Sequence, residues 1–319
     1  MTTFSLSQEF VSNATMVGET DLPVMGVDLS PLPTKEQLHA FLEKLSRSET
    51  AREMARRKWI RSTSASLRER VADRALALLE FLTVSRPATP AYAMFKGRRL
   101  SSQRSFMDEF ATHAWIAHIT DVSRDHVMPF AFNAKNINRD FLKSLTKLTT
   151  HERGPRFALD AVREIGICVV LESGLPGMSV DGASFHLVGS GPVLALTLRH
   201  DRLDNFWFTL FHEIAHICLH LSEPGDDIFV DSIDDGDSDE IEAEAEANAF
   251  AKDSLIPRDT WLRSNAYRFG NESSVLALAK QLDIHPAIVA GRIRYERRQF
   301  GIFNDLIGRG QVRDLLFKA

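Results

Sequence analysis

The spacing of apolar residues changes from a helical to an extended period partway along the chain. Between residues 34 and 148, apolar side chains recur at steps of three and four, which predicts helices. After Gly154, a short helix is predicted at residues 156–165, and a β-branched run at 166–171 predicts a first strand. The pattern predicts an α+β fold, in which a helical N-terminal region precedes a small mixed sheet.

Turn and capping signals place the elements that follow the first strand. Residues 180–182 are predicted to form a hairpin turn, with residues 183–188 as its second arm and residues 192–198 as a further strand. Asp204 is expected to cap a helix over residues 205–221. Further helices are expected at residues 240–255 and from residue 273 onward.

These changes in pattern also suggest a division of the chain into four parts. The first 32 residues show no sustained period, and we expect a weakly ordered tail there. The parts that follow are a helical region at 33–153, a central α+β domain at 154–270 and a helical subdomain at 271–319.

The predicted helix at residues 205–221 carries the most informative group of residues. Its side chains are apolar on all sides, which is typical of a buried helix. His212 and His216 lie one turn apart, and Glu213 is rotated by about 100° from His212. Histidines can also serve as ordinary core residues, but a buried acid between two of them would be costly without a function. The pattern predicts a metal site in which Glu213 stays free as a general base.

A catalytic zinc ion normally has three protein ligands, so a third ligand is needed. The acidic helix that follows offers several glutamates. Glu246 shares a face with Ala249 and Phe250, which we expect to pack inward. Glu244 lies roughly opposite and is expected to meet solvent, whereas Glu242 is one turn from Glu246 and remains the alternative ligand.

Three further residues are candidates for stabilising a transition state or supporting the ligands. His220 lies one turn beyond His216. Arg199 and His200 follow the last predicted strand, just before the site-bearing helix. The sequence does not decide among these three, and each of them has an ordinary structural reading as well.

At this point the sequence resembles a known family. Residues 201–216, together with 246–251 and 255–257, resemble the ImmA/IrrE family of zinc metallopeptidases. The resemblance implies a zincin-like domain that binds one Zn²⁺ ion per chain. It assigns the metal ligands to His212, His216 and Glu246, and the catalytic role to Glu213.

The flanks at residues 53–60 and 284–292 resemble a subgroup that is fused to HigA-type antitoxin regulators. Members of the family act in the cytoplasm on helix-turn-helix repressors, or in toxin-antitoxin and stress circuits. The resemblance implies a protein substrate cleaved at few sites. The alternative is a non-catalytic antitoxin or transcriptional regulator that acts by binding a partner or DNA.

Two charged segments have a plain and a functional interpretation. The acidic stretch at residues 222–245 contains no Lys or Arg, and we favour a solvated loop over a surface that attracts a basic substrate. Residues 275–282 and 286–298 have the period of a helix-turn-helix with a basic end. That end contains Arg292, Arg294, Arg297 and Arg298. We favour packing against the peptidase domain over direct DNA binding.

Composition narrows the picture without changing it. The chain has 319 residues, of which 44% are hydrophobic and 25% charged, and a formal net charge of -5, so nothing points to nucleic acid. No apolar run is long enough to span a membrane. Cys168 and Cys218 both lie in apolar runs, which argues against a disulfide framework. We expect a cytoplasmic protein.

Overall fold

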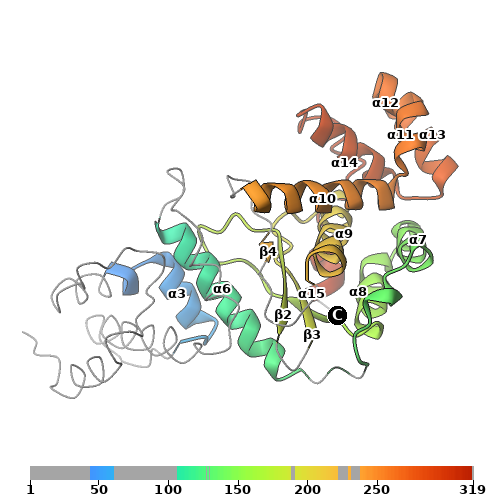
Figure 1. Cartoon of the computed structure of the whole chain (residues 1–319). Helices are drawn as coiled ribbons and strands as arrows, with labels where there is room; N and C mark the ends of the chain where they lie inside the picture. The colour runs from blue at the N-terminus through green and yellow to red at the C-terminus, as the bar shows by residue number, and fades with distance from the viewer. Residues whose placement is uncertain are drawn as a thin grey trace, which may run out of the picture.

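The computed structural model describes residues 44–60, 106–126, 128, 130–187, 191–221, 229–230 and 238–317. In this part of the chain a small sheet lies between helices on both of its faces (Figure 1). The predicted tail at residues 1–32 and much of the predicted helical region lie outside the described residues. The α+β class and the small mixed sheet are confirmed.

The sheet has four strands in the order β1-β3-β2-β4. The strands are β1 (Cys168–Leu171), β2 (Gly182–Leu187), β3 (Gly191–Leu196) and β4 (Phe229–Val230). β1 runs parallel to β3, and β2 runs antiparallel to both β3 and β4. Ala183 in β2 lies opposite Ala195 on one side and Val230 on the other. β2 is therefore the strand between the core of the sheet and its short outer strand.

The hairpin predicted around residues 180–182 is wrong. The chain between β1 and β2 forms no strand, and β2 pairs instead with β3. The backbone carbonyls after β1 are used by the N-terminal helices: Trp115 Nε1 donates to the carbonyl of Glu172, and Arg57 donates to those of Ser173 and Gly174. Gly177 follows with a φ of 89°, a conformation that favours glycine. These contacts hold the segment as a loop.

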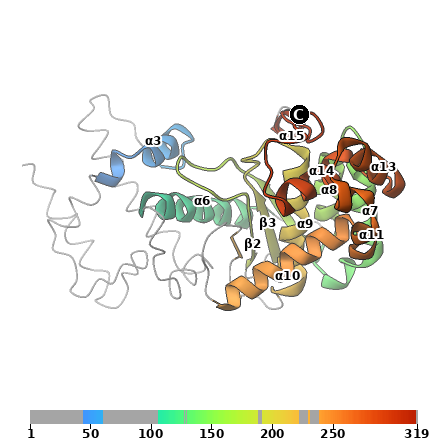
Figure 2. The same cartoon turned by 90° about the horizontal axis from the view of Figure 1, so that it is seen from above.

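One face of the sheet is covered by helices, which include α8 (Gly154–Glu164) and α9 (Leu203–Leu219). There α10 (Ser238–Leu255) packs on the outer side of α9. Val169 and Leu194 of the sheet pack in one apolar core with Trp207 and Phe211 of α9. The largely buried α9 thus lies directly on the sheet (Figure 2).

The opposite face is covered by α3 (Glu49–Arg56) and α6 (Phe106–Arg124). Cys168 and Val170 of β1 point to this side, because successive residues of a strand face opposite ways. They pack in a second apolar core with Met54 and Trp115. In Figure 2, α6 and α9 lie on opposite sides of β2 and β3.

The C-terminal helices begin earlier than residue 273 and share the core of α9. They are α11 (Arg258–Arg263), α12 (Asn265–Phe269), α13 (Glu272–Leu282), α14 (Pro286–Glu296) and α15 (Gln311–Phe317). Ile288 and Ile293 of α14 pack in the same apolar core as Phe211. A division of the chain at residue 270 stays a prediction, since the described core runs across it.

Three short elements lie between α6 and α8 in the chain. They are the 3-10 turn η1 (Ala134–Asn136), α7 (Arg139–Lys147) and the 3-10 turn η2 (Leu148–Thr150). α7 has a local cap: the Asn138 side chain accepts hydrogen bonds from the first backbone N–H groups of the helix.

None of the helices in the described ranges is long and apolar enough to cross a lipid bilayer.

The N-terminus of α9 differs from the predicted cap. The helix begins at Leu203, with Arg202 in the capping position, and the side chain of Asp204 makes no cap. Asp204 instead pairs with Arg202, whose Nε lies 2.9 Å from Oδ1. Burial raises the pKa of the Asp204 carboxyl, although Arg202 opposes this. The predicted cap at Asp204 is therefore wrong, while the helix itself lies close to its predicted bounds.

Candidate metal centre

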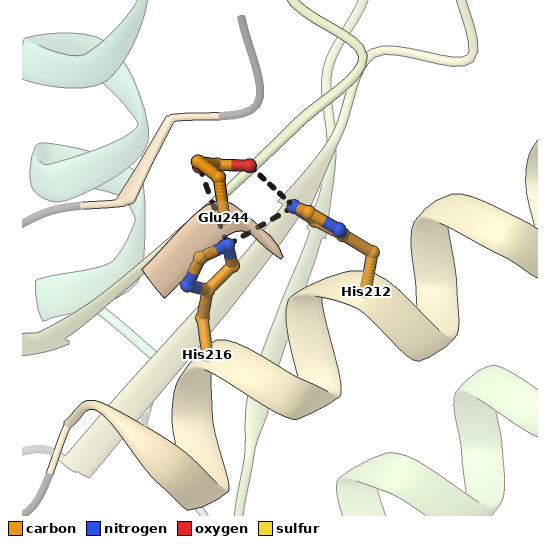
Figure 3. A group of neighbouring side chains, drawn as sticks. All are labelled: His212, His216 and Glu244. Carbon is orange, nitrogen blue, oxygen red and sulfur yellow. Dashed lines mark hydrogen bonds and ion pairs between the residues drawn. The ribbon is translucent and has the colours of Figure 1, made fainter. Parts of the chain in front are cut away.

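Three ionisable residues of α9 lie within an otherwise apolar helix, and all three are buried. His212, Glu213 and His216 have relative exposures of 1%, 0% and 0%. The Nε2 atoms of His212 and His216 lie 3.0 Å apart. One turn of helix thus aims two imidazole nitrogens at the same point, on the side of α9 that faces α10 (Figure 3).

Glu244 of α10 completes this group. Its Oε2 lies 3.2 Å from His212 Nε2, and its Oε1 lies 3.5 Å from His216 Nε2. The potential ligand atoms of the three residues all lie within 4.8 Å of one another. Within the described part of the chain, this is the group of histidine, cysteine and acidic side chains that could hold a metal ion. Two imidazoles and one carboxylate are a donor set found at catalytic zinc sites.

The structure does not place Glu246, the predicted third ligand, in this group. Glu246 is 58% exposed, and its Oε2 lies 3.1 Å from Nε2 of His220. Glu242, the alternative, is also exposed and lies outside the group. The expectation that Glu244 meets solvent is wrong, because its side chain is only 30% exposed and faces the two histidines.

The error comes from the rotation of α10 about its axis. Ala249, which was expected to pack inward, is exposed, whereas Ala247 and Ala251 are buried. Glu244 lies within about 60° of Ala247 around the helix and about 20° of Ala251, while Glu246 lies about 140° from Ala251. The face that packs on α9 therefore carries Glu244.

The protonation states of the group suit a metal ion. Burial raises the pKa of the Glu244 carboxyl, but the hydrogen bonds with His212 and His216 outweigh this and lower it to about 2. Burial lowers the pKa of His216 to about 4, although Glu244 opposes the effect. At neutral pH the carboxylate is charged and His216 is neutral, which are the forms that bind metal.

Glu213 lies beside this group and points to β2. The Ser184 hydroxyl of β2 donates a hydrogen bond to its Oε2. Gly182 lies against the same carboxylate: a Cβ atom at this position would approach Glu213 Oε1 to 2.4 Å. Ser184 and Gly182 were not predicted as site residues. No local pattern indicates them, since the contact joins a strand to a helix that is distant in sequence.

The other candidates lie outside the metal-binding group. Arg199 Nε donates to Asp181 Oδ1 at 3.1 Å. His200 is half-buried, and burial lowers its pKa. His220 follows the last residue of α9, and its Nδ1 lies 3.0 Å from Nδ1 of His216. Of the three candidates, the structure brings His220 into contact with a predicted ligand.

The basic end of the C-terminal helices is largely occupied by contacts within the chain. Arg292 donates to the carbonyls of Lys252 and Ile256 at the end of α10. Arg294 is buried and donates to the carbonyl of Ile302. Arg297 donates to two backbone carbonyls of α12, those of Tyr267 and Phe269. The preference for packing over DNA binding stays a prediction. Most of the acidic stretch before α10 lies outside the described residues.

The arrangement defines a class of protein. Two histidines one turn apart, a glutamate from the next helix and a buried Glu213 between the histidines are compatible with a metallopeptidase-type site. The comparison with protein families agrees, because residues 164–294 match the model of the IrrE N-terminal-like domain, Peptidase_M78. This part of the chain is therefore similar to the ImmA/IrrE family. A search of curated proteins finds no match, and the likeness to HigA fusions stays a prediction.

Proposed function

We propose that this protein is a zinc-dependent endopeptidase that cleaves a regulatory protein at few sites. The observation that carries the proposal is the position of Glu213. It follows His212 directly in α9 and is fully buried, and its carboxylate does not belong to the group of His212, His216 and Glu244 but accepts a hydrogen bond from Ser184. A purely structural metal site has no need of such a base, whereas hydrolysis requires one.

Different residues of the chain have different roles in the proposed hydrolysis. His212, His216 and Glu244 would hold the ion. When bound, Zn²⁺ supplies Lewis acidity, which polarises a peptide carbonyl and acidifies a water molecule. Glu213 takes the proton of the attacking water and then passes it to the nitrogen of the leaving amine. Ser184 orients this carboxylate through Oε2, so we assign the transferred proton to Oε1.

The substrate class rests on the resemblance and on charge. We infer a helix-turn-helix repressor or a component of a toxin-antitoxin system. If the acidic stretch at residues 222–245 borders the site and is not simply a solvated loop, it would favour a basic segment, such as the positive surface of a DNA-binding protein. Changing Asp234, Asp235 and Asp237 together to Asn should slow the cleavage of a basic substrate. An unchanged rate would remove this argument for the substrate.

Replacing Glu213 tests the enzymatic activity. Glu213→Gln should keep the metal and the fold but reduce cleavage of candidate repressors by about 10²- to 10⁴-fold. Metal content and cleavage are measured on the same preparation. Glu272→Gln is the matched control, because it changes an exposed glutamate of α13 outside the metal group and outside the acidic stretch, and it should cleave at the unchanged rate.

The same variant separates the enzyme from the alternative of a non-catalytic regulator. A regulator that acts by binding a partner or DNA does not need the carboxylate of Glu213. If Glu213→Gln retains its metal and its full biological activity, the peptidase proposal is wrong.

A further inference from the structure

His216 uses both of its ring nitrogens. Its Nε2 faces His212 and Glu244, 3.0 Å and 3.5 Å away. Its Nδ1 points to the other side of the ring, where Nδ1 of His220 lies 3.0 Å away. The Nε2 of His220 in turn lies 3.1 Å from Oε2 of Glu246. A continuous chain of contacts runs from the metal-binding group to an exposed carboxylate.

We propose that His220 and Glu246 form a relay that positions His216 for the metal ion. The relay rests on the proposed function, since it requires a metal ion at Nε2 of His216. His220 and Glu246 are positioning residues: they act through His216 and do not contact the reacting atoms. The predicted ligand role of Glu246 is thereby replaced by a supporting one.

The proton positions along the relay follow from its two ends. A neutral imidazole that binds metal through Nε2 carries its proton on Nδ1, so His216 donates to Nδ1 of His220. His220 then carries its own proton on Nε2 and donates it to Glu246. With neutral rings, this arrangement gives both contacts one donor and one acceptor. The carboxylate at one end and the metal ion at the other thus select the tautomer of both histidines.

The backbone holds the relay in place. His220 is the C-terminal cap of α9, and its N–H donates to the carbonyl of His216 at 2.9 Å. The His220 side chain is 11% exposed, so its ring is partly shielded from water. Glu246 comes from α10, two residues after Glu244. Both glutamates therefore tie α10 to histidines of α9, one at each side of His216.

Such a partner has a known effect on a ligand histidine. A hydrogen bond to the second ring nitrogen fixes the orientation of the imidazole and makes it a better donor to the metal. Loss of the partner weakens metal binding by about 10- to 100-fold in comparable sites. An ordinary surface ion pair between His220 and Glu246 would leave metal affinity unchanged.

Zinc affinity, measured by competition with a chelator, tests the relay. His220→Phe should weaken zinc binding about 10- to 100-fold, and Glu246→Ala should weaken it in the same direction by less. The double variant should bind no more weakly than His220→Phe, because Glu246 acts through His220. Glu242→Ala removes an exposed glutamate from the same helix and should leave the affinity unchanged.

The tautomers give a readout that does not depend on any variant. Long-range ¹H–¹⁵N spectra of the zinc-loaded protein should show His216 protonated on Nδ1 and His220 protonated on Nε2. A proton on Nδ1 of His220 overturns the relay, as do unchanged affinities in His220→Phe and Glu246→Ala. If the unaltered protein takes up no zinc, the relay and the peptidase proposal fail together. If the protein binds zinc, and the affinities and tautomers are those expected for the relay, but no cleavage is observed, only the peptidase proposal is contradicted.

Discussion

The two faces of the sheet have opposite chemical characters. On one face, α9 buries two histidines and a glutamate next to apolar residues such as Phe211. On the other face, α3 and α6 pack apolar side chains such as Trp115 and Met54 on the sheet. The chain before the family match thus supplies a second core beneath the strands that support the site.

The residues of the metal group lie on one face of the sheet, and the second apolar core lies on the other face. Charged groups are costly to bury, and the face of α9 accommodates them through one another and through Ser184 of β2. The opposite face packs apolar side chains in a separate core, which contains none of the three residues of the metal group, and can stabilise the sheet by apolar packing. Changes on the two faces should therefore have separable effects on unfolding and on cleavage.

The largest effect is expected from the apolar face. Trp115 is fully buried, so Trp115→Ala should lower the free energy of unfolding by about 3–5 kcal/mol. Zinc affinity should stay unchanged under conditions where the variant is folded. Trp207→Ala, on α9, should cost similar stability and also weaken zinc binding, because this helix carries the ligands. Equal losses of zinc affinity in both variants would break the contrast between the faces.

A smaller effect is expected where β2 touches Glu213. In Gly182→Ala, the new methyl group would displace the Glu213 carboxylate, since it would come within 2.4 Å of Oε1. A misplacement of about 1 Å should reduce the rate of cleavage by about a hundredfold, with little change in zinc content. Gly301→Ala is the matched control, because nothing lies within 4 Å of a Cβ atom there. Full activity of Gly182→Ala would show that the base tolerates displacement.

The hydroxyl of Ser184 should contribute less. Ser184→Ala removes the hydrogen bond to Glu213 Oε2, and we expect cleavage to slow by about tenfold. Ser123→Ala makes the same chemical change at a buried serine of α6 and should leave the rate unchanged. The cleavage rates of both variants test this expectation. Equal rates in Ser184→Ala and Ser123→Ala would mean that Ser184 does not orient the carboxylate of Glu213.

The smallest effect is a pH dependence on the apolar face. The hydrogen bond from Arg56, with a further one from Arg57, lowers the pKa of Glu53 from 4.5 to about 2. The folded protein therefore binds fewer protons than the unfolded chain between these values. The stabilisation is present above pH 4.5 and is lost as the pH falls towards 2.

Glu53→Gln should lower the free energy of unfolding by less than about 1 kcal/mol at pH 7. The difference from the unaltered protein should shrink below pH 4.5, and zinc affinity should not change. Denaturant unfolding at several pH values measures this difference in the free energy of unfolding. A difference that grows on acidification would contradict the assigned pKa direction.

The sequence predicts the parts of the site that lie within one helix. His212, Glu213 and His216 are fixed relative to one another by the geometry of α9, so their spacing alone predicts their arrangement. The third ligand depends on how α10 is rotated against α9. Alanines at every second position of α10 leave no single apolar face, and the sequence pattern therefore could not distinguish Glu244 from Glu246.

The same limit explains the errors in the fold. The sequence predicts β1, β2 and β3 near their true positions but misses β4, which lies in the expected acidic loop, and strand pairing is a long-range property. The hairpin predicted around residues 180–182 is wrong because the segment before β2 is held as a loop by Arg57 and Trp115. These two residues are distant in sequence, so the local pattern does not show their contacts. Ser184 and Gly182 were missed for the same reason, as their importance arises from packing against α9.

The most direct test of the central claim is anomalous diffraction at the zinc edge from crystals of the zinc-loaded protein. We expect one peak, bonded at about 2.0–2.2 Å to Nε2 of His212, Nε2 of His216 and a carboxylate oxygen of Glu244. Glu213 should lie beside the peak without bonding to it. A peak bonded to Glu246 in place of Glu244, or no peak at the two histidines, would contradict the account.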